Sequence, residues 1–244
     1  MSDRGFIRNT AVKMAVKMGV YTKIVDRLNR RIAKREAKAI RENGVEVLAK
    51  VDEVLTKAGV KPFFVFGLLL GAYRDKGFIS YDYDLDLGIM DSERPDNMLD
   101  LMRESGFRLV RQFYTKDDGR ITVEQFEYNK VPVDFYYFFE KDEDTFAVIV
   151  PFKHEYKDWK EANESDGFPS QIITAERTTF SRHDFMGIQF HMPDKADSWL
   201  AGFYGADFMT PVKNWAIGKR ETTRRPYPVR QYRNLDIVRQ QAEL

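Results

Sequence analysis

The sequence predicts an α/β fold, in which a mixed β-sheet is flanked by helices and preceded by an N-terminal amphipathic helical segment. Three observations support this prediction: helical spacing of apolar residues near the N-terminus, short apolar runs bounded by Gly or Pro, and amphipathic stretches between those runs. The 244 residues are enough for one sizeable domain with appendages. We divide the chain into a basic amphipathic helical segment, 1–46, an α/β domain, 47–215, and a basic C-terminal tail, 216–244.

The helical segment carries an apolar seam with alternating spacings of four and three residues, which is typical of a heptad repeat on a helix. The seam consists of Ile7, Ala11, Met14, Met18, Tyr21, Val25, Leu28 and Ile32. Its other faces are rich in Arg and Lys. Three roles are open: a helix packed on its own domain or on a partner subunit, a basic helix lying on an anionic membrane surface, or a flexible arm.

The first half of the domain alternates helices and strands. Apolar positions continue at helical spacing over 47–58, and Gly59 is expected to end that helix. The run KPFFVF predicts a buried strand that ends at Gly67, and LLLGAYRDKG predicts a short helix closed by Gly77. The run SYDYDLDLGIM, residues 80–90, predicts the next strand.

The second half of the domain continues with a helix, several strands and a last helix. NMLDLMRESG predicts an amphipathic helix that ends at Gly106. ITVEQFEYNK and VPVDFYYFF predict a pair of strands joined at Asn129 and Lys130. Residues 151–180 are expected to be mostly connection, because Pro and Gly interrupt them. GIQFHMP predicts a short strand, and DKADSWLAGFYG a helix capped by Asp194.

Composition excludes several classes of protein. The hydrophobic fraction of 43% is that of a globular protein, and the absence of cysteine excludes disulfides, thiolate metal sites and a cysteine nucleophile. The longest nearly apolar run, FFVFGLLLGAY, is shorter than the about 20 residues that cross a bilayer. Lysines interrupt the apolar positions at the N-terminus, which is unlike a secretory signal. We therefore expect a cytoplasmic protein.

Charge is distributed unevenly along the chain. Residues 1–50 carry 13 basic and 5 acidic side chains, residues 51–212 carry 18 and 30, and residues 213–244 carry 8 and 3. A nucleic-acid-binding domain is expected to present a basic face, so the acidic body argues against nucleic acid as a partner. The two basic ends leave an anionic partner open, including a peripheral contact with the inner face of a membrane.

Aspartates recur at every second position in the run 80–90. On a strand Asp82, Asp84 and Asp86 would share one face, while Tyr83 and its apolar neighbours would share the other. Like charges this close are destabilising unless water screens them or a cation binds between them. The run alone leaves both readings open, a solvated edge strand or a metal site.

A further carboxylate, Asp134, lies among Val, Phe and Tyr in VPVDFYYFF. An ionised carboxylate buried there needs a hydrogen bond, an ion pair or a metal. Carboxylates converging from adjacent strands can hold one or two Mg²⁺, which prefers oxygen ligands and shares its shell with substrate phosphates. A glycine that begins a helix, such as Gly67, lets backbone N–H groups approach a phosphate. This combination is typical of the nucleotidyltransferase fold.

The stretch FGLLLGAYRDKGFISYDYDLDLGIM resembles the hallmark of the LicD family, approximately G-T-L-L-G-A-x-R-x-x-G-x-I-x-W-D-D-D-I-D-x-G. VPVDFYYFF resembles the family's short strand with its third aspartate. GFPSQIITAERTTFSRHDFMGIQFHMPDKADSWLAGFYGADFMTP resembles its closing region. The resemblance runs from about residue 60 to residue 213 and identifies the domain 47–215 as LicD-like and catalytic.

The resemblance implies roles for the acidic residues. Asp84, Asp86 and Asp134 would be the catalytic carboxylates and the metal ligands. Asp134 would act either as a ligand or as the base for an acceptor hydroxyl. Asp82 would contribute to substrate binding. Tyr83 replaces the middle aspartate of the family's triplet, but on a strand it would face away from the metal.

The resemblance also implies substrate contacts outside the acidic run. Gly67 would belong to the turn that holds the donor phosphate. Leu68 stands where the family has threonine, which removes a hydroxyl from that turn. Arg74 matches the family arginine and would either hold a phosphate as a bidentate fork or form a salt bridge to an aspartate such as Asp82.

Family members transfer a phospho-alcohol, such as phosphocholine or ribitol phosphate, from a CDP-linked donor to a glycan hydroxyl and release CMP. The resemblance therefore implies a phosphotransferase that requires Mg²⁺ or Mn²⁺, with a CDP-linked small-alcohol donor and a glycan acceptor that could be lipid-linked. Two alternatives stay open. One is a nucleotidyltransferase that uses an NTP, and the other is a non-catalytic member that binds glycan or scaffolds an assembly.

Overall fold

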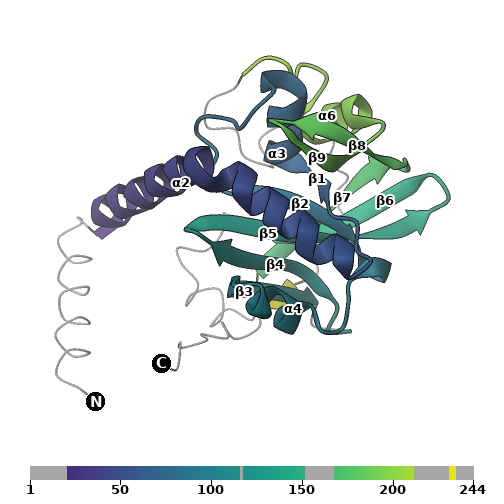
Figure 1. The fold of residues 1–244 in the computed structure, drawn as a ribbon, viewed down its shortest axis with the longest axis horizontal. Coiled ribbons are helices and arrows are strands. Elements are labelled where there is room, and N and C mark those ends of the chain that lie inside the picture. Colours follow the sequence, from purple (N-terminus) through teal and green to yellow (C-terminus); the bar gives the residue numbers. More distant parts are fainter. Residues whose placement is uncertain (1–20, 116–117, 152–167, 212–230, 235–244) are drawn as a thin grey trace.

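The computed structural model describes residues 21–115, 118–151, 168–211 and 231–234. These residues form one mixed sheet with helices on both faces (Figure 1), which confirms the predicted fold class. The strands are β1 (Phe63–Phe64), β2 (Leu85–Met90), β3 (Arg108–Thr115), β4 (Ile121–Tyr128), β5 (Val131–Asp142), β6 (Thr145–Pro151), β7 (Phe168–Glu176), β8 (Phe180–Phe185), β9 (Ile188–Pro193) and β10 (Gln231–Asn234). The helices are α2 (Tyr21–Lys57), α3 (Phe66–Leu70), α4 (Met98–Glu104) and α6 (Ala196–Tyr204), with a π-helical turn, Gly71–Asp75, and a 3₁₀ turn, Asp91–Glu93.

The sheet is organised around β5, the longest strand. The strand order is β4-β3-β10-β7-β6-β5-β2-β1-β9-β8, and a further pairing joins β4 to β5. The first half of β5 therefore lies between β4, which is antiparallel, and β2, which is parallel. The second half pairs with β6, and β7, β10 and β3 complete a ring back to β4. This arrangement places β2 directly beside the start of β5.

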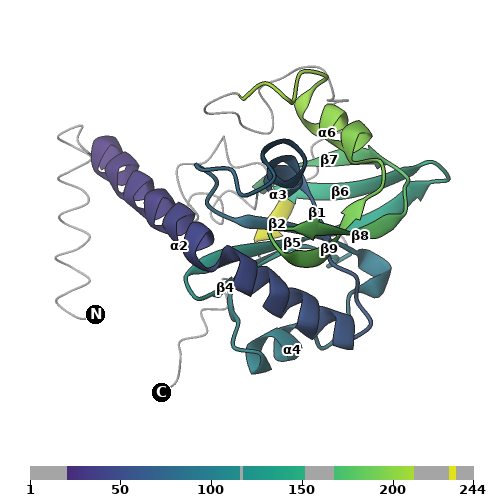
Figure 2. The same ribbon diagram turned by 45° about the horizontal axis from the view of Figure 1, so that its top comes forward.

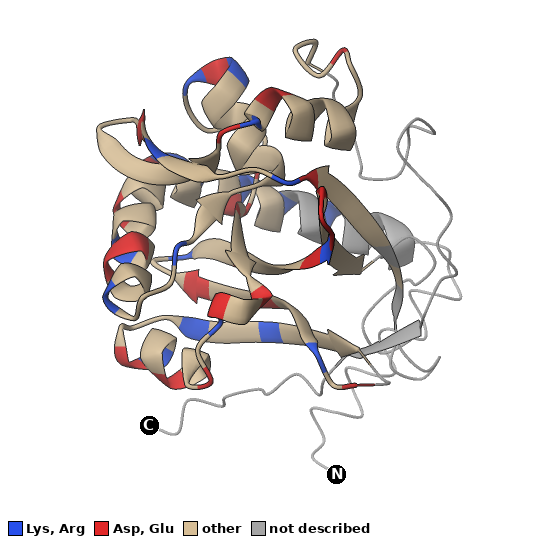
Figure 3. Cartoon of the chain, turned by 90° about the vertical axis from the view of Figure 1, so that its right-hand side faces the viewer, with Lys and Arg blue, Asp and Glu red and all other residues tan. Residues whose placement is uncertain are grey.

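The two faces of the sheet have different covers. Side chains alternate between faces along β2, so that Leu85 and Leu87 point to one face and Asp86 to the other. Helices α2 and α4 lie on one side of the sheet, and α3 and α6 lie on the opposite side (Figure 2). The backbone of α3 contacts Asp86, so the apolar face of β2 is the one that α2 and α4 cover. Figure 3 shows long stretches without charge on the strands and most charged positions on helices and turns.

Helix α2 is a single helix from Tyr21 to Lys57, and it runs without a break across residues 46 and 47. Its second half buries residues at spacings of three and four against the sheet: Val47, Leu48, Val51, Val54 and Leu55. The helix stops as predicted, because Gly59 adopts φ +79° and the N–H of Val60 bonds back to the carbonyl of Leu55. Of the predicted seam, residues 1–20 lie outside the described residues.

Three local predictions are wrong. Strand β2 begins at Leu85, not at residue 80, because the preceding residues form a turn. The stretch 151–180, predicted as mostly connection, contains β7 and the start of β8, and β7 pairs with β6 from Ser170 to Glu176. The N-cap of α6 is Lys195 rather than Asp194, whose side chain accepts a hydrogen bond from Thr179 instead. Within the predicted tail, residues 231–234 form β10; the boundaries of the tail remain a prediction.

The face that carries Asp86 has its own apolar core under α6. Trp199 is fully buried and donates its indole N–H to the carbonyl of Glu176, at 2.8 Å. Its ring stacks on Phe138 at a centroid distance of 5.4 Å and meets Phe63 edge-on. A Cβ at Gly88 would overlap the ring of Phe63, so only glycine allows β2 to pass beneath this cluster. The cluster fixes β1, β2 and β5 relative to one another beside the acidic residues.

Candidate active site

Three carboxylates converge where β2 and β5 lie side by side. Asp86 and Asp134 are directly paired in the parallel register of the two strands, and both are buried. Asp84 lies just before β2 and is half-buried. One oxygen of each of the three carboxylates lies within 4.8 Å of the others, which brings the three predicted metal ligands together. Oxygen ligands at this spacing suit a hard divalent cation such as Mg²⁺.

The electrostatics of the cluster favour a cation. Burial raises the pKa of Asp86 well above its usual range, and the nearby charges of Asp82 and Asp134 raise it further. Hydrogen bonds from the backbone N–H of Gly67 and the hydroxyl of Tyr136 lower the pKa of Asp86 and partly offset these effects. A divalent cation would relieve the remaining repulsion, because it stabilises the ionised form of every carboxylate around it. The donor set therefore fits a divalent metal ion.

Asp82 is not one of the three clustered carboxylates, but its side chain is in hydrogen-bond contact with Asp84 and its charge acts on Asp86. It belongs to the turn before β2, where its backbone N–H bonds to the carbonyl of Ile79 and its carboxylate accepts the N–H of Tyr83 at 3.2 Å. Burial raises the pKa of Asp82 to about 6. Because these residues form a turn, Tyr83 does not alternate on a strand as predicted, and its side chain is half-exposed at 50%.

Gly67 is the second residue of α3, the short helix beside the acidic cluster, rather than its first residue. Its N–H donates to Oδ2 of Asp86 at 3.1 Å, so this backbone group orients a carboxylate of the cluster. A Cβ at position 67 would overlap the carboxylate of Asp82, so a larger residue here would displace that side chain. The neighbouring side chain of Leu68 is only 3% exposed and belongs to the hydrophobic core, so it is not available to a substrate.

Arg74 forms an ion pair with its neighbour Asp75, not with Asp82. Its Nε and Nη2 donate to the two carboxylate oxygens of Asp75 at 2.7 and 2.8 Å. This hydrogen-bonded pair raises the pKa of Arg74 and lowers that of Asp75. The guanidinium of Arg74, which was expected to bind a phosphate or Asp82, is thus held by Asp75.

A pocket opens next to the carboxylates, on the side of α3 and α6. It is lined by Gly67 and Asp82, which lie beside the acidic cluster, and by Arg74. The other residues that line it are Leu70, Ile79, Tyr81, Tyr83, Tyr204, Asp207, Phe208 and Thr210. The mixture of aromatic walls with a few polar groups is typical of a small-molecule binding site.

The sequence analysis missed three side chains on this face of the sheet. Tyr136, treated within an apolar run, hydrogen-bonds Asp86. Gln125 on β4 donates to Asp134, and Arg111 on β3 is in register with Gln125. Burial lowers the pKa of Arg111, and the carboxylate of Asp134 opposes that effect. No sequence signal marks these residues, because their roles follow from strand register.

Asp82 should give the metal-free protein a characteristic pH dependence. Its pKa in the folded state, about 6, exceeds the ordinary value of 3.8, so between these pH values the folded state binds more protons than the unfolded state. The contribution of Asp82 to stability is therefore present below about pH 4 and lost as the pH rises through 6. We compare the thermal unfolding midpoints of Asp82→Asn and of the native protein in EDTA. The amount by which the midpoint of the variant exceeds that of the native protein should increase from pH 4 to pH 7. A difference that is constant with pH would contradict this assignment.

The site and its scaffold define a class of protein. The mixed sheet carries the features of a nucleotidyltransferase-type domain: an acidic pair at the start of one strand, a third carboxylate on the parallel neighbour, and a short helix whose Gly67 N–H binds one of these carboxylates. Comparison with known families agrees and is more specific. The chain matches the family described as LicD/FKTN/FKRP, nucleotidyltransferase domain, over residues 59–195, and it belongs to that family.

The chain is also similar to individual curated proteins. It is 24% identical over 180 residues to the protein named ribitol-5-phosphate transferase FKTN from Macaca fascicularis, and equally to that from Homo sapiens. The alignment covers 74% of this chain and 36% of each relative, so the chain spans about a third of their length. An uncharacterized protein of Rickettsia typhi is 28% identical over 109 residues, which cover 38% of this chain and 34% of that protein.

Among the described residues, no helix is long and apolar enough to span a membrane.

Proposed function

We propose that this protein transfers a phospho-alcohol from a CDP-linked donor to a hydroxyl of a glycan in a metal-dependent reaction that releases CMP. The observation that carries the proposal is the convergence of Asp84, Asp86 and Asp134 within 4.8 Å. Membership of the LicD family supports the class of reaction, and the fukutin relatives support ribitol phosphate as one candidate for the transferred group. Phosphocholine and glycerol phosphate are the other candidates.

The reaction is an in-line displacement at the phosphorus distal to cytidine. The acceptor hydroxyl oxygen forms a bond to that phosphorus, and the bond from the phosphorus to the bridging oxygen breaks. The bridging oxygen leaves with CMP, and the hydroxyl proton passes to a nearby base or to water. Mg²⁺ or Mn²⁺ held by Asp84, Asp86 and Asp134 would supply charge stabilisation for the phosphate oxygens.

The residues of the chain would position the reactants. Gly67 and Tyr136 orient Asp86 through hydrogen bonds, which keeps one of the cluster's carboxylates in place before substrate arrives. The aromatic pocket beside the cluster is the proposed place for the donor, and Arg74 is the cation on its wall. Leu68, which stands where the family has threonine, has its side chain in the core and does not line the pocket.

The proposal is tested by thermal unfolding and product analysis with CDP-ribitol, CDP-choline, CDP-glycerol and CTP, each with Mg²⁺ or with EDTA. A ligand present at 100 times its Kd adds about 2.7 kcal/mol to the free energy of unfolding. For a chain of this size that corresponds to roughly 5–10 °C in the midpoint. We expect one CDP-alcohol to produce this shift only with metal, and CMP to appear when a glycan acceptor is added.

Other outcomes of this panel would contradict the proposal. A shift with CTP and release of pyrophosphate would identify a nucleotidyltransferase that attacks the α-phosphorus. A panel without any metal-dependent shift would favour a non-catalytic member that binds glycan or scaffolds an assembly. The two results differ in their product, so they are separated by measuring pyrophosphate and CMP in the same samples.

A further inference from the structure

Gln125 contacts the acidic cluster from the neighbouring strand. Its side-chain Nε2 donates to Oδ1 of Asp134 at 2.6 Å. The two residues are directly paired in the antiparallel register of β4 and β5, so their side chains leave the same face of the sheet side by side. Both are on regular strands, and Asp134 is only 9% exposed. The contact is therefore built into the sheet and does not depend on a loop.

The register extends this contact into a row across four strands. Arg111 pairs with Gln125, Gln125 with Asp134, and Asp134 with Asp86. Along this row, Asp86 receives hydrogen bonds from Gly67 and Tyr136, while Asp134 receives one from Gln125. Donors that fix the ligands of a metal are a regular feature of metal sites, and their loss commonly costs 10- to 100-fold in metal affinity.

We infer that Gln125 is a positioning residue that commits Asp134 to binding the metal rather than to acting as the base. The amide donor binds Oδ1 and holds the carboxylate plane beside Asp84 and Asp86, each of which has an oxygen within 4.8 Å of an oxygen of Asp134. A carboxylate held in a fixed plane beside two further carboxylates has the placement of a metal ligand. The inference rests on the metal dependence of the proposed function, and it decides between the two roles that the sequence left open for Asp134.

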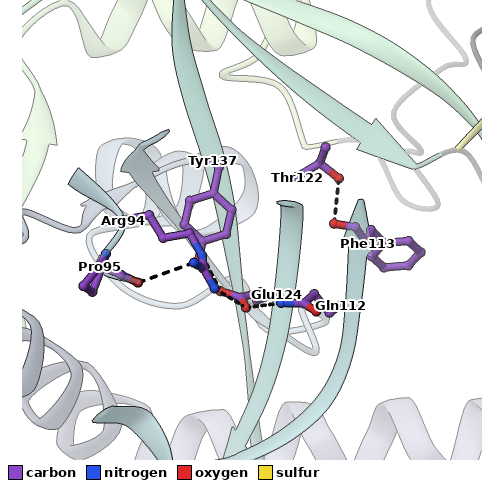
Figure 4. Close-up of polar contacts among 7 residues, drawn as sticks. All are labelled: Arg94, Pro95, Gln112, Phe113, Thr122, Glu124 and Tyr137. Atoms are coloured by element: carbon purple, nitrogen blue, oxygen red, sulfur yellow. Dashed lines mark hydrogen bonds and ion pairs between the residues drawn. The ribbon is translucent and has the colours of Figure 1, made fainter. Parts of the chain in front are cut away.

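The chain offers a matched control on the opposite face of the sheet. Gln112 on β3 donates its Nε2 to Oε1 of Glu124, also at 2.6 Å (Figure 4). Glu124 and Gln125 are consecutive on β4, so their side chains point to opposite faces. Gln112 and Gln125 thus make the same kind of hydrogen bond at the same length, but only Gln125 reaches the metal cluster.

The test compares Gln125→Leu and Gln112→Leu with the native protein. Mn²⁺ affinity is measured by calorimetry or electron paramagnetic resonance, and stability is measured by thermal unfolding in EDTA. For Gln125→Leu we expect a Kd for Mn²⁺ that rises about 10- to 100-fold, with a metal-free midpoint close to the native value. For Gln112→Leu we expect a lower midpoint and a native Kd, because its partner Glu124 is a fully buried carboxylate on the face of the sheet opposite to the cluster.

Turnover gives a second readout. In Gln125→Leu, the Mn²⁺ concentration for half-maximal rate should rise, while kcat at saturating Mn²⁺ should fall less than tenfold. A native Kd in Gln125→Leu, an equal loss of affinity in Gln112→Leu, or a loss confined to kcat would overturn the inference, as would native protein that binds no Mn²⁺. The affinity measurement uses no nucleotide. The Mn²⁺ affinities could therefore still be interpreted if the proposal of a CDP-linked donor failed.

Discussion

Replacing Asp86 by asparagine is expected to lower transfer by about three orders of magnitude without destabilising the metal-free protein. A thousandfold loss corresponds to about 4 kcal/mol of transition-state stabilisation, which is within what a bound metal ion supplies. The metal-free fold should tolerate the change because burial and neighbouring carboxylates already disfavour the ionised form of Asp86. The asparagine oxygen can still accept the N–H of Gly67.

This prediction is checked by measuring CMP release and the Mg²⁺-induced shift of the unfolding midpoint. Asp86→Asn should lose both. Glu127→Gln is the matched control, since Glu127 is two residues from Gln125 on the same face and instead pairs with Arg108 at 3.0 Å. Glu127→Gln should retain both properties. Turnover of Asp86→Asn within tenfold of the native rate would remove Asp86 from the proposed machinery.

The sequence was sufficient to predict the fold class and the three converging carboxylates. Alternation along the acidic run placed Asp84 and Asp86 together, and the lone Asp134 in an apolar strand indicated a site that needs a counter-charge. Parallel pairing of β2 and β5 then brings Asp86 and Asp134 into register. The fold class is confirmed and the three carboxylates lie together, because both follow from local patterns and family motifs; their roles as metal ligands and catalytic groups stay a prediction.

The features that the sequence did not predict depend on local side-chain hydrogen bonds that compete with strand formation, and on how the strands pair. The predicted strand included Asp82 and Tyr83. Instead, the carboxylate of Asp82 accepts a hydrogen bond from the backbone N–H of Tyr83, which favours a turn over a strand. The contact of Gln125 with Asp134 follows from how β4 pairs with β5, which no single segment specifies. Strand β7 was missed because its Gly and Pro neighbours resemble a connection, whereas pairing with β6 decides its conformation.

A buried polar network on the other face of the sheet holds β4 and β5 to the segment after β2 (Figure 4). Glu124 is fully buried, and Arg94 donates to its two oxygens at 2.9 and 3.2 Å. Gln112 and the hydroxyl of Tyr137 donate to the same carboxylate. Because Arg94 follows β2 in the chain, this network ties the strand that carries Asp86 to its neighbours on the face of the sheet opposite to the acidic cluster.

Replacing Arg94 by methionine is expected to destabilise the protein by about 3–5 kcal/mol, because it leaves the charge of Glu124 buried without its ion-pair partner. For a chain of this size, the unfolding midpoint should fall by roughly 6–20 °C. Adding Glu124→Gln to Arg94→Met should recover part of the loss, since it removes the uncompensated charge and keeps an acceptor for Gln112. A double-mutant cycle in thermal or urea unfolding measures this coupling, and additive losses would show that the ion pair is not the source of the stability. The folded fraction of Arg94→Met should bind Mn²⁺ with native affinity, because Arg94 acts on the face of the sheet opposite to the carboxylates.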